Sequence, residues 1–137
     1  MGERVLTMEF EAHFRNVDMA RAALQGISAE CFGKDTERAA DITMAVNEAM
    51  NNAVEHTGST TVTLEIAWNG KELRVSVISG GPPFDPLAAV SGLNEDDMLE
   101  RDEGGYGLYL IRELVDSFEY EYRNFFNVWT LRKYITL

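Results

Sequence analysis

The chain reads TVTLEIAWNGKELRVSVIS over residues 61–79, with apolar and polar side chains alternating on both sides of the pair Asn69-Gly70. A period of two predicts strands with one face on a core, and Asn-Gly is a strong short-range signal for a β-hairpin turn. We therefore predict a strand over 61–68 and a partner strand over 71–79. The parity of the second strand places Ser79 on its apolar side.

The segments before this hairpin change from a strand period to a helical one. Residues 4–14 alternate and predict a strand with one face in water. In residues 16–32 and 35–56, apolar side chains recur at spacings of three and four, which predicts two helices. Asn16 or Asp18 is available as the N-cap of the first helix.

A long irregular segment, residues 80–103, follows the hairpin and holds all 3 prolines and a run of acidic residues. Segments this long inside a domain are usually functional lids or disordered. A helix over 106–118 comes next, and alternation over 119–123 and 127–135 predicts a terminal hairpin. The fold class is therefore α+β: a two-layer sandwich with helices on one face of a mixed, mostly antiparallel sheet. Because no linker or repeat divides the chain, we expect residues 1–137 to form a single domain.

Composition argues against several classes of partner. The chain carries 23 acidic and 12 basic residues, for a net charge of −11, and this charge repels nucleic acids and anionic membranes. No apolar run approaches the roughly 20 residues that a membrane helix needs, and the first residues do not resemble a signal peptide. We expect a cytoplasmic protein that binds neither nucleic acid nor membrane.

The predicted helix over 35–56 carries Glu48, Asn52 and His56 at steps of four. Such positions advance only about 40° around a helix, so the three side chains share one strip. A carboxamide oxygen suits Mg²⁺, and a neighbouring carboxylate can then polarise a hydroxyl or a water molecule. The same spacing occurs on the solvated face of any amphipathic helix, so this pattern alone leaves both interpretations open.

Two glycine segments favour the functional interpretation. VISGGPPFDP, at 77–86, takes a strand directly into a Gly-Gly-Pro-Pro turn. GGYGLYLIRELVD, at 104–116, places glycines directly before a predicted helix start, where free N–H groups and the helix dipole favour an anion. Either segment alone could be an ordinary turn. The helix strip and the two glycine segments together indicate a nucleotide site.

With these segments in view, the sequence resembles the anti-sigma factor serine/threonine kinases of the histidine-kinase-like (GHKL) ATPase superfamily. NEAMNNAVEH at 47–56 is similar to the N box of that family, the two glycine segments are similar to its glycine boxes, and NVWTLRK at 127–133 is similar to its last strand. The resemblance covers nearly the whole chain. It implies the histidine-kinase-like ATPase fold and a protein-serine kinase that uses ATP and Mg²⁺. It further implies an anti-sigma factor that phosphorylates a STAS-domain anti-anti-sigma partner, and a possible homodimer.

The resemblance also implies roles for individual residues. Glu48 would be the base that prepares the substrate serine, Asn52 the Mg²⁺ ligand, and His56 part of the nucleotide pocket. Arg101 is the only cation between residues 87 and 103, and it is either the partner of the terminal phosphate or a surface charge. The full set of implied nucleotide-binding positions is Asn52, His56, Ser79, Gly81, Phe84, Arg101, Gly104, Gly105, Gly107 and Leu108.

Ser79 is the main departure from the family pattern. In the first glycine box of the family, an aspartate at this position accepts a hydrogen bond from the adenine amino group. A serine hydroxyl is shorter and uncharged, and hydrogen bonds to charged groups are about twice as strong. The alternative hypothesis is therefore a weak or inactive module that binds a sigma factor or a STAS-like protein without efficient nucleotide recognition. Gly81 and the run Pro82–Pro86 are kept, which argues that the pocket floor retains its shape.

Overall fold

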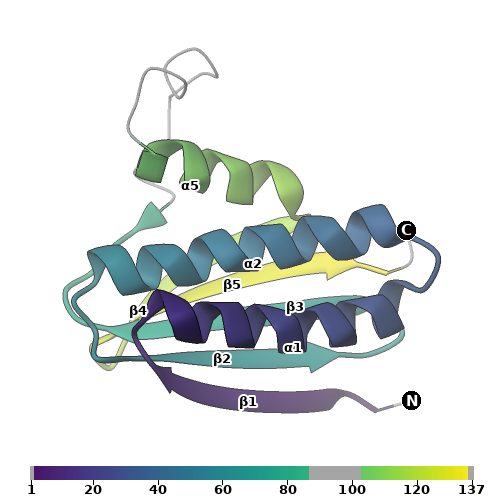
Figure 1. The fold of residues 1–137 in the computed structure, drawn as a ribbon, viewed down its shortest axis with the longest axis horizontal. Coiled ribbons are helices and arrows are strands. Elements are labelled where there is room, and N and C mark those ends of the chain that lie inside the picture. The colour runs from purple at the N-terminus through teal and green to yellow at the C-terminus, as the bar shows by residue number, and fades with distance from the viewer. Residues whose placement is uncertain (1, 87–102, 136–137) are drawn as a thin grey trace.

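The computed structural model describes residues 2–86 and 103–135. The elements, in chain order, are β1 (Arg4–Glu11), α1 (Phe14–Phe32), α2 (Thr36–His56), β2 (Thr61–Trp68), β3 (Glu72–Gly80), α5 (Glu103–Leu114), β4 (Ser117–Arg123) and β5 (Phe126–Tyr134). The strands form one sheet in the order β1-β2-β3-β5-β4, and each described pairing is antiparallel. The three described helices lie on the same face of this sheet (Figure 1), which confirms the predicted two-layer α+β sandwich.

The central hairpin forms as the alternation predicts. Trp68 pairs with Leu73 across the turn, and the side-chain oxygen of Asn69 accepts hydrogen bonds from the backbone amides of Lys71 (2.7 Å) and Glu72 (3.0 Å). The apolar side of both strands is buried under the helices, and Ser79 lies on that side with 4% exposure. The predicted orientation of Ser79 is therefore correct.

Helix α2 lies between α1 and α5 and packs against the middle of the sheet (Figure 1). Its start is fixed by Asp35, whose carboxylate accepts a hydrogen bond from the Arg38 amide (3.2 Å), as expected for an N-cap. Its buried face carries the apolar repeat seen in the sequence: Ile42, Ala45, Val46, Ala49, Met50 and Ala53. This burial anchors α2 in the core, where it also contacts α5.

The predicted boundary between the first strand and the first helix was wrong. β1 ends at Glu11, and the chain turns there, since the His13 amide donates to the Glu11 carbonyl oxygen (2.8 Å). α1 begins at Phe14, and His13 is its N-cap residue. Asn16 therefore lies inside the first turn, where its side-chain amide donates to the Glu11 carbonyl oxygen (2.9 Å) and ties the helix to the end of β1. Asp18 is not the cap either.

The helix predicted over 106–118 occupies Glu103–Leu114 instead. Gly104 and Gly105 therefore lie within its first turn and not before it. At the other end, the Asp116 amide donates to the Arg132 carbonyl oxygen (2.9 Å), and this bond draws the chain into the sheet. Phe118 consequently belongs to β4, where its ring packs edge-on against Trp129 at 5.9 Å between centroids.

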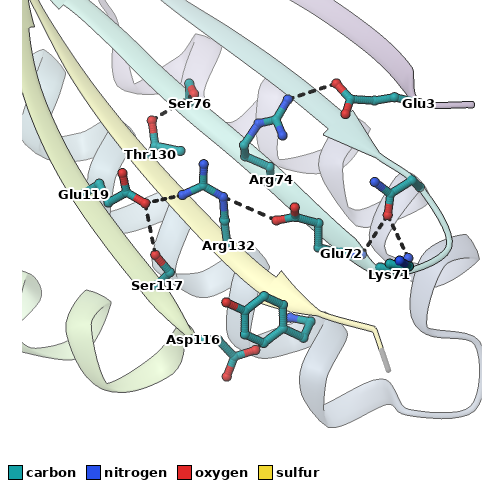
Figure 2. Close-up of polar contacts among 12 residues, drawn as sticks. Glu3, Lys71, Glu72, Arg74, Ser76, Asp116, Ser117, Glu119, Thr130 and Arg132 are labelled. Carbon is teal, nitrogen blue, oxygen red and sulfur yellow. Dashed lines mark hydrogen bonds and ion pairs between the residues drawn. The ribbon is translucent and has the colours of Figure 1, made fainter. Parts of the chain in front are cut away.

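The face of the sheet opposite the helices carries a row of polar contacts (Figure 2). Arg132 on β5 lies between Glu72 (3.3 Å) and Glu119, and it forms an ion pair with each. Beside this group, Ser76 and Thr130 share a hydrogen bond of 3.1 Å between neighbouring strands. The apolar core therefore occupies only the helix side of the sheet. Within the described ranges, no helix has both the length and the apolar character needed to cross a bilayer.

Candidate nucleotide site

The second half of α2 presents the predicted strip of Glu48, Asn52 and His56. Asn52 is only 4% exposed, and its side-chain amide donates to the carbonyl oxygen of Glu48 (2.8 Å). Its side-chain oxygen, Oδ1, is buried without a hydrogen-bond partner among the described residues. Because an unpaired buried acceptor costs free energy, this oxygen is well suited to accept a ligand. The chemistry of a neutral carboxamide oxygen fits a hard cation such as Mg²⁺.

The first turns of α5 cover this strip at Gly107, which is buried. A Cβ atom at Gly107 would lie 2.7 Å from Oε2 of Glu48 and 3.9 Å from Nδ2 of Asn52. A side chain at Gly107 would therefore displace the Glu48 carboxylate. Leu108 follows it and is 4% exposed in the core. The structure thus brings together the predicted acid, the predicted amide and one of the predicted glycines.

The first glycine loop lies against the C-terminal end of α2. Gly81 has φ +102°, and a Cβ there would lie 2.3 Å from the backbone carbonyl oxygen of Thr57. Any other residue would combine a steric clash with a strained backbone. The preceding Gly80 donates its amide to the hydroxyl of Ser59 (2.9 Å). These contacts fix the point where the chain leaves β3.

Phe84, at the far end of that loop, contacts side chains of both α2 and β5. Its ring stacks on His56 with 5.6 Å between centroids and an interplanar angle of 11°, and it also stacks on Trp129 at 5.6 Å and 27°. The predicted positions His56 and Phe84 are therefore in contact. Together they form an aromatic wall between the end of α2 and the sheet.

Ser79 and Asn127 are direct partners in the register of β3 and β5, and both are buried. Sequence reasoning predicted Ser79 but missed Asn127. The only signal in the sequence is that Asn127 occupies the apolar phase of its strand, in line with Trp129 and Leu131.

The remaining predicted positions lie apart from these contacts or outside the described residues. Gly104 and Gly105 are in the first turn of α5, and Arg101 lies outside the described residues. Groups of three or more His, Cys, Asp or Glu side chains able to hold a metal are absent from residues 2–86 and 103–135.

Comparison with known proteins identifies the family. The family model of the histidine kinase-like ATPase domain matches residues 10–133. The chain belongs to this family. Its relatives within the histidine kinase-like ATPases include the serine-protein kinase RsbW of Listeria monocytogenes, which is 31% identical over 140 residues covering 95% of this chain and 87% of the relative. The serine/threonine-protein kinase BtrW of Bordetella bronchiseptica is 27% identical over 94 residues, or 66% of each chain.

Solved structures of this family share the fold. A Mycobacterium tuberculosis structure of RsbU and RsbW domains superimposes with a TM-score of 0.67 at 24% identity, covering 95% of this chain and 32% of the other. The catalytic domain of the histidine kinase ThkA superimposes with a TM-score of 0.54 at 17% identity, covering 96% of this chain and 98% of the other. The predicted family, the serine kinase branch of the histidine kinase-like ATPases, is confirmed.

Proposed function

We propose that this protein is an ATP- and Mg²⁺-dependent protein-serine kinase that acts as an anti-sigma factor and phosphorylates a STAS-domain anti-anti-sigma protein. The observation that carries the proposal is the junction of α2 and α5, where Glu48, Asn52 and Gly107 meet. Phosphoryl transfer asks a protein mainly to position its reactants and to stabilise charge. The carboxylate of Glu48, the side-chain oxygen of Asn52 and the glycine at 107 lie at one helix junction and can meet those needs.

In this proposal Asn52 holds the metal through Oδ1. Its Nδ2 atom is already bonded to the Glu48 carbonyl oxygen (2.8 Å), which orients the carboxamide and leaves the oxygen available. When bound there, Mg²⁺ would offset the negative charge of the phosphates.

Glu48 acts as the base. Its carboxylate accepts the proton of the substrate serine as that hydroxyl oxygen attacks the terminal phosphorus and ADP leaves. Because Gly107 has no side chain, Oε2 of Glu48 keeps the space that a Cβ atom at that position would take.

The nucleotide lies, in this proposal, between the aromatic wall and the start of α5. His56, Phe84, Gly81 and Leu108 line it, and Ser79 faces the base. The amides of the first turn of a helix lack intrahelical partners and favour anions, and we propose that those of Gly104 and Gly105 approach the phosphates. Arg101 is the proposed partner of the terminal phosphate. A single domain, a cytoplasmic location and a homodimer remain predictions.

The test begins with the purified chain and Mg-ATP. We expect a rise in melting temperature, because a ligand that binds only the folded state stabilises it, followed by phosphate transfer to a STAS-domain protein. Glu48→Ala should lower transfer by about 10²- to 10⁴-fold while nucleotide binding is kept. Equal loss of binding and transfer would contradict the role of Glu48 as base, and the absence of a shift with millimolar ATP or ADP would end the kinase proposal.

Ser79 supports the alternative, a module that binds its protein partner without turning over ATP. The buried hydroxyl supplies a weaker acceptor than a carboxylate would. If the pocket is otherwise intact, Ser79→Asp should raise ATP affinity by about tenfold, because charge-assisted hydrogen bonds are stronger. An unchanged affinity in Ser79→Asp, together with undetectable transfer by the parent protein, would favour the binding module.

A further inference from the structure

We infer that Asn127 is a positioning residue, which sets the conformation of the first glycine loop (residues 81–84) and through it the affinity for nucleotide. The second half of this inference depends on the nucleotide site proposed above. The first half concerns the protein alone.

Asn127 is completely buried and uses both ends of its carboxamide on the loop. Its Oδ1 atom accepts a hydrogen bond from the Phe84 amide (2.8 Å), and its Nδ2 atom donates to the Pro82 carbonyl oxygen (3.0 Å). The carboxamide therefore bridges two loop positions on either side of Pro83. Neither partner is close to Asn127 in sequence, so the contact exists only in the folded protein.

The loop needs such a bridge because of its prolines. Pro82 and Pro83 have no backbone N–H, so the turn cannot use these positions as main-chain donors. Side chains of the terminal hairpin supply hydrogen bonds instead. Asn127 bonds to the Pro82 carbonyl oxygen and the Phe84 amide, and the Tyr122 hydroxyl donates to the Gly81 carbonyl oxygen (2.9 Å). The end of the β4–β5 hairpin thus replaces the internal hydrogen bonds that the loop sequence lacks.

Tyr120 fixes the orientation of the bridging carboxamide. Its hydroxyl donates to Oδ1 of Asn127 (2.7 Å), so this oxygen accepts two hydrogen bonds and the amino group must point to Pro82. Burial and the nearby Asp85 carboxylate raise the pKa of Tyr120, although the Phe84 amide lowers it. The hydroxyl therefore keeps its proton at neutral pH.

The position of this loop decides the geometry of the candidate site. The Phe84 ring contacts both His56 and Trp129, and Gly81 fits against Thr57 without room for a side chain. A loop released from Asn127 would move the ring out of the aromatic stack. Binding of the nucleotide would then also have to order the Phe84 ring, and this entropy cost lowers the affinity.

The experiment compares Asn127→Ser with Thr130→Val. Serine is too short to bridge the loop. Thr130 lies on the same strand but on the opposite face, and Thr130→Val removes its hydrogen bond to Ser76, so this variant controls for the loss of one strand contact (Figure 2). Three quantities are measured in each protein: the exchange rate of the Phe84 amide hydrogen without nucleotide, the Kd for Mg-ATP by calorimetry, and the melting temperature.

In Asn127→Ser we expect about tenfold faster exchange at Phe84 and about tenfold weaker binding of Mg-ATP, since one to two net hydrogen bonds are lost. In Thr130→Val both quantities should stay within about twofold of the parent protein, whatever the change in melting temperature. A purely structural role for Asn127 predicts a lower melting temperature with unchanged affinity and unchanged exchange at Phe84, and that result would overturn the inference.

Two further outcomes are decided by the same measurements. If the parent protein does not bind millimolar Mg-ATP, the proposed function fails, while exchange at Phe84 still decides whether Asn127 sets the loop. If Asn127→Ser does not fold, Tyr120→Phe takes its place, because it removes the donor that orients the carboxamide. Faster exchange at Phe84 in that variant supports the positioning role, and unchanged exchange refutes it.

Discussion

At the scale of single residues, Gly81 is the position where the backbone leaves least freedom. Its φ is +102°, and a Cβ atom added there would lie 2.3 Å from the Thr57 carbonyl oxygen, so both the backbone and the space exclude a side chain. We expect Gly81→Ala to destabilise the fold by about 1–3 kcal/mol and to weaken Mg-ATP binding by at least about tenfold. Denaturant unfolding and calorimetry measure these effects. Gly26→Ala is the matched control, because that site in α1 is open and alanine favours a helix by up to about 1 kcal/mol.

Gly107 differs from Gly81 because its near neighbour is the end of a flexible side chain. A Cβ there would meet Oε2 of Glu48 at 2.7 Å, and this carboxylate can rotate away. We expect Gly107→Ala to leave the free energy of unfolding unchanged or slightly higher, since alanine is the better helix former, while phosphate transfer falls by roughly tenfold or more because the base is displaced. Transfer assays beside urea titrations test this. Normal transfer in Gly107→Ala would show that the carboxylate does not act from this position.

At the scale of elements, Lys133 attaches the C-terminal end of α5 to the sheet. Its Nζ atom donates to the Leu114 carbonyl oxygen (2.7 Å) and lies 3.5 Å from Asp41 on α2, with only 10% of the side chain exposed. A cation there bonds to a helix-terminal carbonyl oxygen that has no intrahelical partner, and it is attracted to the negative end of the helix dipole. Lys133→Met should therefore lower the free energy of unfolding by about 1–3 kcal/mol. Lys71→Met, in the exposed β2–β3 turn, should change it by less than about 0.5 kcal/mol.

The elements that were predicted correctly are those with local causes. The turn at Asn69-Gly70 satisfies its own amides within three residues, and the apolar repeat of α2 needs only one face to be buried. The predicted start of α1 and both predicted ends of α5 were wrong, while the end of α1 at Phe32 was predicted correctly. The C-terminal end of α5 was missed because the Asp116 amide donates to the Arg132 carbonyl oxygen, a partner that local periodicity does not reveal.

The same distinction applies to the site. The spacing of Glu48 and Asn52 was sufficient to place them on one strip of α2, but their contact with Gly107 required the packing of a second helix. Asn127 could not be assigned from sequence, because the loop that it holds is distant in the chain: Phe84 lies 43 positions before it. Only its polar character in an apolar strand phase marked it as unusual.

At the scale of the whole molecule, the net charge of −11 on 137 residues should make stability depend on salt. Self-repulsion destabilises a compact, strongly charged chain, and the Debye length falls from about 30 Å at 0.01 M to about 8 Å at 0.15 M ionic strength. Ion pairs such as those of the partly exposed Arg132 weaken over the same range, and pairs at the surface contribute about 1 kcal/mol or less each.

We therefore expect the melting temperature to rise when NaCl is increased from about 0.01 M to about 0.15 M, because relief of the net repulsion exceeds the loss from a few ion pairs. Differential scanning calorimetry in a buffer of low ionic strength measures this directly. Sucrose at equal osmolality controls for effects of the solute that do not involve charge. A melting temperature that falls with salt would contradict this expectation. It would mean that the stability lost from screened ion pairs, among them the Glu72–Arg132–Glu119 group (Figure 2), exceeds the stability gained by screening the net negative charge.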